Sequence, residues 1–302
     1  MGAEEKPKYI DIIKDVFQEH KLIGRKVGVE LGYEQMMGIP FNDYLRIVNS
    51  LRPTMFVDAS AILNQLRMVK SEAEINCLRR ASEIQSKAFK VCFNTIQEGT
   101  TEKDIVRIIR TTVAKEGGLP RWALISSGAP GSGQFGIGER YATDRKLTKG
   151  DLLFIDIGAT WQGYHSDFSR MGTFGPPSKD VINAHGTVCQ ALRSVIEAIE
   201  PSVKVAELVH VCRAEFKKRG VDISKGVGIT SPSRIGHGIG LLMSEMPGVA
   251  SYDDTILTPG ISLAIEPTLQ LDDVFFNVEH NVVVTDQGCE ILSRFPLDLQ
   301  EV

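Results

Sequence analysis

Residues 1–66 alternate between short segments of helical and of strand periodicity. Apolar side chains recur at helical spacing from Ile10 to His20 and again from about Phe41, which predicts two helices. Short apolar runs at Val27–Leu31 and Met55–Asp58 predict two strands. This is an α/β arrangement with little sheet of its own, so we expect residues 1–66 to be an incomplete domain.

Two longer helices are predicted after residue 67. Ser71 and Glu74 have the spacing of a capping box, which predicts a helix from there to about Gln97. A second helix is predicted from Thr100 or Thr101 to Gly117-Gly118. Its apolar stripe has helical spacing and consists of Ile105, Ile108, Ile109 and Val113.

A loop and two strands are predicted next. The glycine-rich segment Ser126–Gly138 is typical of a loop, and the continuous apolar run Leu152–Ile155 is typical of a buried strand. Gly158–Gly163 then predicts a hairpin turn that leads the chain back to Asp167.

The second half of the chain repeats this order. Helices are predicted at Lys179–Ile199 and Val205–Arg219, followed by a loop that carries His237. Strands are predicted near Ile261–Ile265 and Phe275–Val284. Because the order helix, helix, loop, strand, strand occurs twice, we expect residues 67–302 to form a pseudo-twofold duplication.

Composition narrows the class of protein. The 302 residues carry a formal net charge of −4 with scattered basic residues, which argues against a nucleic-acid partner. No apolar run approaches the ~20 residues of a membrane span, and the polar N-terminal segment lacks the apolar core of a signal peptide. The five cysteines lack C-x-x-C spacing, so free, reduced and mostly buried thiols are expected. We therefore expect a cytoplasmic protein without membrane or nucleic-acid partners.

Two segments about a hundred residues apart share one plan. K-G-D-L-L-F-I-D ends in Asp156, and P-G-I-S-L-A-I-E ends in Glu266. In both, the acid falls six residues after a turn glycine, at the end of an apolar strand. Each strand leads to a second acid, Asp167 in the first half and Glu279 in the second, and His237 lies between the halves.

These five side chains have the composition of a metal site. Four neighbouring carboxylates would raise one another's pKa values unless cations neutralised them. Oxygen ligands with one imidazole suit Mn²⁺, Fe²⁺, Co²⁺ or Zn²⁺, with Mn²⁺ our first expectation. Two such ions can activate water and polarise a carbonyl oxygen. The pattern therefore predicts hydrolysis of an amide or related bond.

Four motifs resemble the pita-bread metalloenzymes, the family of methionine aminopeptidase, Xaa-Pro aminopeptidase, prolidase and creatinase. They are D-I-G-A-T-W-Q-G-Y-H-S-D (156–167), G-H-G-I-G-L (236–241), A-I-E-P (264–267) and V-E-H-N-V-V-V-T (278–285). The resemblance implies an α+β pita-bread fold with pseudo-twofold duplication over residues 67–302. It also implies that residues 1–66 are a partial creatinase-type N-terminal domain whose first half is missing.

The resemblance also implies a role for each ligand. Asp156 resembles a terminal ligand of one ion, Asp167 and Glu279 the bridging carboxylates, and His237 and Glu266 the ligands of the other ion. Glu266 resembles the family's proton shuttle as well, which makes it a candidate general base. The family often forms homodimers through the N-terminal domain, so a homodimer is a further expectation.

Three other residues are candidates for catalysis or substrate binding. His165 is two residues before Asp167 and shares its strand face, where it either lines the site or packs behind it. Glu139 and Ser244 stand where family peptidases carry histidines that hold the substrate carbonyl or the tetrahedral intermediate. Asn277 and His280 replace the usual Arg and Asp on either side of Glu279.

These departures leave three functions open. The first is a hydrolase of a small peptide or amino-acid derivative, with Xaa-Pro dipeptides as its expected substrates. The second is a creatinase-like or lyase-like enzyme that uses Glu139 to recognise a small cationic metabolite; Glu139 as a surface residue paired with Arg140 is the alternative to that role. The third is a non-catalytic pita-bread binding protein, which the retention of all five ligands disfavours.

Overall fold

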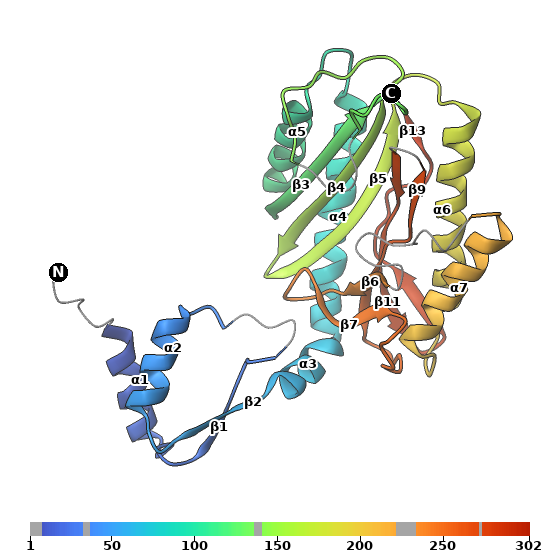
Figure 1. Ribbon diagram of the computed structural model, residues 1–302. Helices are drawn as coiled ribbons and strands as arrows, with labels where there is room; N and C mark the ends of the chain where they lie inside the picture. The colour runs from blue at the N-terminus through green and yellow to red at the C-terminus, as the bar shows by residue number, and fades with distance from the viewer. Residues whose placement is uncertain (1–7, 33–36, 136–140, 222–233, 272–273) are drawn as a thin grey trace. The chain divides into compact units, whose positions relative to one another are not determined.

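The chain divides into two compact units, Met1–Leu66 and Arg67–Val302. The computed structural model describes residues 8–32, 37–135, 141–221, 234–271 and 274–302 (Figure 1). Among these residues, no helix combines the length and the apolar composition that crossing a membrane requires. All five cysteines are free thiols, and Cys92, Cys189 and Cys212 are buried, as expected from the sequence.

The first unit has the predicted alternation of helices and strands. Its elements are α1 (Lys8–Glu19), β1 (Lys26–Val29), α2 (Phe41–Ser50) and β2 (Met55–Asp58). Strands β1 and β2 pair in parallel, and Ile10, Ile47 and Leu51 form a small buried core. A further helix, α3 (Ser60–Met68), was not predicted. The relation of this unit to a creatinase-type domain stays a prediction.

Two helices open the second unit, and both begin with a capping box. These are α4 (Glu72–Thr95), capped by Ser71 and Glu74, and α5 (Glu102–Lys115), capped by Thr101 and Asp104. Reciprocal side-chain and backbone bonds satisfy N–H groups that a helix start leaves without an intrahelical partner. The buried faces of both helices pack on β3–β5 through one apolar cluster that includes Phe89, Ile105 and Phe168.

Replacing Thr101 with alanine is expected to lower the free energy of unfolding by about 1 kcal/mol, because the Asp104 amide loses its 3.0 Å bond to Thr101 Oγ1. Urea unfolding followed by circular dichroism measures this change. Thr111→Ala is the control, since Thr111 is an exposed residue of the same helix and caps nothing. Equal stabilities of the two variants would contradict a stabilising cap.

A four-stranded sheet carries the first pair of acids. Its order is β13 (Gln300–Glu301), β5 (Tyr164–Thr173), β4 (Leu152–Trp161), β3 (Leu119–Gly128). Strand β4 is longer than predicted, since the hairpin turns only at Gln162 and Gly163. Residues 126–128, predicted as loop, belong to β3, because they pair with the first residues of β4.

The second half repeats the helix pair and adds a five-stranded sheet. Helices α6 (Lys179–Glu197) and α7 (Val205–Lys218) lie where they were predicted. The sheet order is β12 (Gly288–Ile291), β11 (His280–Thr285), β8 (Ser262–Ile265), β6 (Arg234–Gly238), β7 (Glu245–Ala250). In Figure 1 the strands of the unit lie between α5 on one side and α6 and α7 on the other.

Two predictions for the second sheet were wrong. His237 lies within strand β6 and not in a loop. The strand predicted at Phe275–Val284 is two strands, β10 (Val274–Asn277) and β11, with Val278 and Glu279 between them. Strand β10 pairs with β9 (Thr268–Leu271) in a separate hairpin. The interruption places Glu279 just before β11 pairs with β8.

Candidate metal centre

Strands β4 and β5 present their acids on one face. Asp156 pairs with Ser169, and Asp167 pairs with Gly158, two positions further along β4. Directly opposite residues of an antiparallel pair, and alternate residues of one strand, point to the same side of a sheet. The carboxylates of Asp156 and Asp167 therefore share the face that looks away from α4 and α5.

Three strands of the second sheet bring its ligands to the same place. His237 on β6 pairs with Ala264 on β8, and Glu266 follows β8 directly, its amide donating to Ile235 over 2.8 Å. The β6–β8 approach requires Gly236, because a Cβ there would overlap the carbonyl oxygen of Ala264. Glu279 comes just before the pair formed by His280 and Ile265.

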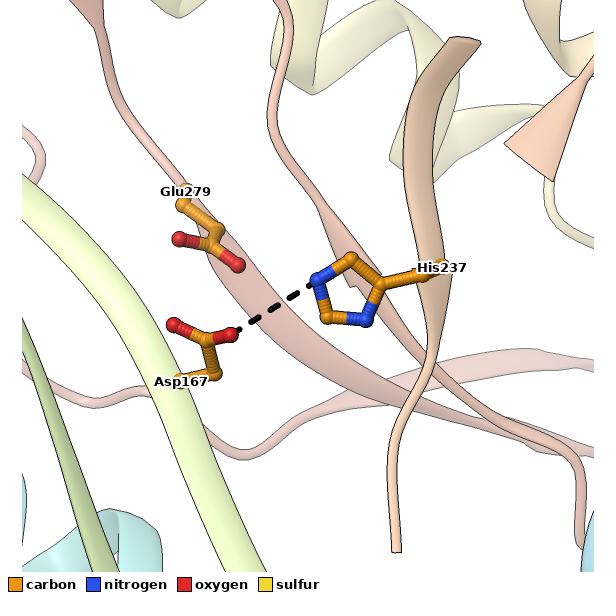
Figure 2. A group of neighbouring side chains, drawn as sticks. All are labelled: Asp167, His237 and Glu279. Carbon is orange, nitrogen blue, oxygen red and sulfur yellow. Dashed lines mark ion pairs between the residues drawn. The ribbon is translucent and has the colours of Figure 1, made fainter. Parts of the chain in front are cut away.

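One buried cluster joins the two halves of the unit. Ligand atoms of Asp167, His237 and Glu279 all lie within 4.8 Å of one another. Nε2 of His237 is 3.6 Å from Asp167 Oδ2 and 3.8 Å from Glu266 Oε1. Figure 2 shows the carboxylates of Asp167 and Glu279 and the imidazole of His237 pointing toward one another.

The donor set of this cluster fits a divalent ion. Nδ1 of His237 lies 3.0 Å from the carbonyl oxygen of Gly238, which can only accept, so the proton belongs on Nδ1 and the lone pair of Nε2 faces the carboxylates. Ligands bound about 2 Å from one ion lie within about 4 Å of each other, close to the spacing found here. A cation bound between these buried carboxylates would offset their repulsion.

Comparison with known proteins identifies the family. The sequence profile of metallopeptidase family M24 matches residues 76–286. The chain belongs to this family. An uncharacterized peptidase of Staphylococcus aureus is 29% identical over 254 residues, which are 83% of this chain and 69% of that relative.

Solved structures show which M24 fold the chain adopts. An X-Pro aminopeptidase of Thermotoga maritima superposes with a TM-score of 0.86 at 28% identity, over 99% of this chain and 80% of that one. A prolidase of Pyrococcus horikoshii gives 0.84 at 25% identity, over 98% and 80%. The predicted α+β pita-bread fold is thereby confirmed, and the M24 family implies divalent metal ions.

Side chains behind the cluster form hydrogen bonds to the backbone of its two carboxylate residues and of the neighbouring Glu266. The amide of Asn281 brackets Asp167, accepting from its N–H over 2.8 Å and donating to its carbonyl oxygen. Arg170, fully buried, donates over 2.6 Å to the carbonyl oxygen of Glu279. Asn277 donates to the carbonyl oxygen of Glu266 over 3.4 Å. Such outer contacts fix the direction of metal ligands.

None of these supporting roles was predicted from the sequence. Asn281 and Asn277 are each two residues from Glu279, so strand alternation could have suggested that they share its region. Nothing in the sequence marks Arg170, which also donates to the carbonyl groups of Ser169, Phe295 and Pro296 and lies 3.4 Å from Nδ1 of His280. These contacts join the C-terminal segment to the metal centre.

Asp156 stands beside the three-residue cluster and not within it. Its Oδ1 accepts a 3.2 Å hydrogen bond from Nε1 of Trp122, a residue that the sequence did not single out. The indole ring lies against Gly158, where any Cβ would overlap it. The structure thus brings Asp167, His237 and Glu279 together, keeps Glu266 beside His237, and places Asp156 on the adjacent strand.

Of the three other candidate residues, the structure describes His165 and Ser244 but not Glu139. His165 is buried on the face of Asp167, and burial lowers the pKa of its imidazole below the ordinary value, so the ring is neutral at pH 7. Ser244 is half-buried, and its Oγ accepts from Arg234 over 3.1 Å. Glu139 lies outside the described residues, and its predicted contact with substrate stays a prediction.

Proposed function

We propose that this M24 metallopeptidase hydrolyses the amide bond of small Xaa-Pro peptides with two divalent ions, Mn²⁺ first and Fe²⁺, Co²⁺ or Zn²⁺ as alternatives. The convergence of Asp167 on β5, His237 on β6 and Glu279 just before β11 carries the proposal. Two of the similar structures are an X-Pro aminopeptidase and a prolidase, and this similarity supports the choice of bond.

The five side chains have separate tasks in this proposal. Asp156, Asp167 and Glu279 would hold one ion, and His237 and Glu266, together with Asp167 and Glu279, would hold the other. When bound, the ions polarise the substrate carbonyl and make water a stronger nucleophile. Glu266 takes a proton from the attacking water and returns it to the leaving amine. Its side chain is 17% exposed, against 8% for Asp167, so it can reach both.

The roles of Ser244 and Glu139 also belong to this proposal. Ser244 borders the substrate, and Arg234, 3.1 Å from its Oγ, fixes the position of the hydroxyl. The rival function, turnover of a cationic metabolite, depends on Glu139, which the structure does not describe. Cytoplasmic location and a homodimer also stay predictions.

Turnover of a mixed pool of Xaa-Pro peptides by the Mn²⁺-loaded protein tests the proposal, with mass spectrometry for products and metal analysis of the same sample. We expect release of the residue before proline and two metal ions per chain. Chelation by EDTA should abolish turnover, and Mn²⁺ should restore it. Two bound ions without cleavage of any peptide would reject Xaa-Pro hydrolysis in favour of another small substrate, and absence of metal would favour a binding protein.

A further inference from the structure

An irregularity in the edge strand β3 turns two neighbouring side chains toward the metal centre. Pro120 pairs with Ala159 and Ala123 pairs with Ile157. Two residues of β3 therefore lie between these pairs, but only one residue of β4 does. The extra residue is a β-bulge, in which two residues, here Arg121 and Trp122, stand opposite Gly158. Regular alternation would send one of them to the helix-covered face.

Contacts of both side chains agree with this geometry. Nε1 of Trp122 donates to the proposed ligand Asp156, and Nε of Arg121 donates over 3.3 Å to Nε2 of His165. The rings of Trp122 and His165 are stacked, with centroids 6.4 Å apart and planes 18° from parallel. A continuous wall of side chains therefore leads from Asp156 to Arg121.

His165 is placed to orient Arg121 and not to exchange protons with a substrate. Nδ1 of its ring lies 3.2 Å from the carbonyl oxygen of Gly240, so Nδ1 carries the proton and Nε2 accepts from the arginine. Both ring nitrogens are thus engaged by the protein. The sequence left open whether His165 lines the site or packs behind it. These contacts favour a residue that positions Arg121 and does not contact the substrate.

The guanidinium of Arg121 is presented to solvent. The side chain is exposed, and within the part of the chain that the structure describes its hydrogen bond is made through Nε. The two terminal nitrogens form a planar fork that matches a carboxylate in a bidentate geometry. A substrate carboxylate beside this guanidinium would make a charge-assisted contact, which is stronger than a contact between neutral groups.

We propose that Arg121, held by His165, binds the free carboxylate of the substrate, a residue-level assignment that rests on the proposed peptidase function. Two residues along β5 separate His165 from Asp167, a rise of about 7 Å. That span corresponds to about two residues of extended peptide. The preferred substrate is therefore a very short peptide whose C-terminal carboxylate lies within one or two residues of the scissile bond.

Paired substrates test this assignment. Ala-Pro carries the carboxylate, and Ala-Pro-amide replaces it with a neutral group of the same size. We expect Arg121→Ala to lower kcat/KM for Ala-Pro about 10- to 100-fold, mainly through KM, and to leave kcat/KM for the amide within about twofold. Arg110→Ala is the matched control, an exposed arginine on α5, and it should change neither substrate.

The role of His165 is tested by substitutions that keep or remove an acceptor. His165→Gln retains a carbonyl oxygen that can accept from Arg121, whereas His165→Leu retains none. We expect the leucine variant to lose the preference for Ala-Pro over its amide and the glutamine variant to recover part of it. Bound metal measured in each variant separates loss of orientation from loss of the metal centre.

Failure of this assignment is distinguishable from failure of the proposed function. Equal losses for both substrates, or no loss for either, in Arg121→Ala with metal retained would overturn the role of Arg121 while leaving peptidase activity in place. If the wild-type protein cleaves neither, calorimetric binding of Ala-Pro and Ala-Pro-amide replaces kinetics. Binding of Ala-Pro that is stronger than that of the amide and weakened by Arg121→Ala then supports the assignment, and indifference to the carboxylate overturns it.

Discussion

Glu279→Gln is expected to remove bound metal and to lower peptidase activity by more than about 10²-fold, because changes to outer contacts alone already cost 10- to 100-fold. The glutamine has the size of the native side chain but lacks its negative charge. Glu279 is buried, 2% exposed, and belongs to the cluster with Asp167 and His237, so its charge acts on the centre with little solvent screening.

The fold should survive this substitution. Removing one of several crowded carboxylates relieves repulsion in the metal-free protein, so its thermal midpoint should stay constant or rise. Excess Mn²⁺ should stabilise the wild-type protein by about 3 kcal/mol at 100 times Kd and the variant much less. Calorimetry with and without Mn²⁺, together with metal analysis, measures both effects. Glu98→Gln, an exposed residue, is the control. A variant with two ions and full activity would contradict a ligand role for Glu279.

Helices of the second unit could be predicted from the sequence because their signals are local. Ser71 stands directly before the first helical residue and Glu74 lies in the first turn, and the structure shows the predicted capping box there. The apolar stripe that contains Ile105 and Ile109 faces the core, as its spacing indicates. Information for each helix lies within a few residues of its ends, so no knowledge of the rest of the fold is required.

Strand β6 was not predicted because its glycines are required by contacts with neighbouring strands and not by a turn. Gly236 and Gly238 flank His237, and glycines of this spacing are typical of a loop. The structure requires them for another reason: a Cβ at Gly236 would overlap Ala264, and one at Gly238 would overlap the backbone of Met246. Close approach of neighbouring strands cannot be read from the segment itself.

Candidate ligands could be named because Asp156 and Glu266 each follow an apolar run in a repeated frame, and each run leads to a second acid. Trp122 and Arg121 could not, since a bulge in β3 decides which way they point, and a bulge shows only when β3 and β4 are paired. The support of Glu279 by Arg170 joins residues 109 positions apart. Sequence patterns thus predict which side chains the centre uses, while the orientation of these side chains depends on contacts between distant segments.

Lys70→Met is expected to destabilise the second unit by about 3–5 kcal/mol, because it leaves a buried carboxylate without its cation. Nζ of Lys70 lies 3.0 Å from Glu245 Oε2, and the two side chains are only 2% and 3% exposed. The other oxygen of Glu245 accepts from the amide of Leu242, so the pair fixes the segment between His237 and β7. For a unit of this size the loss corresponds to a fall of roughly 6–20 °C in Tm.

A double-substitution cycle separates this charge effect from lost packing. Lys70→Met combined with Glu245→Gln should regain much of the lost stability, because a neutral amide tolerates the apolar surroundings and can still accept from Leu242. The exposed pair of Lys204 and Asp254, 3.2 Å apart, is the control, and Lys204→Met should cost less than about 1 kcal/mol. If the double variant is no more stable than Lys70→Met alone, removing the unpaired charge of Glu245 has had no effect. The loss of stability would then come from the lost packing of the lysine side chain.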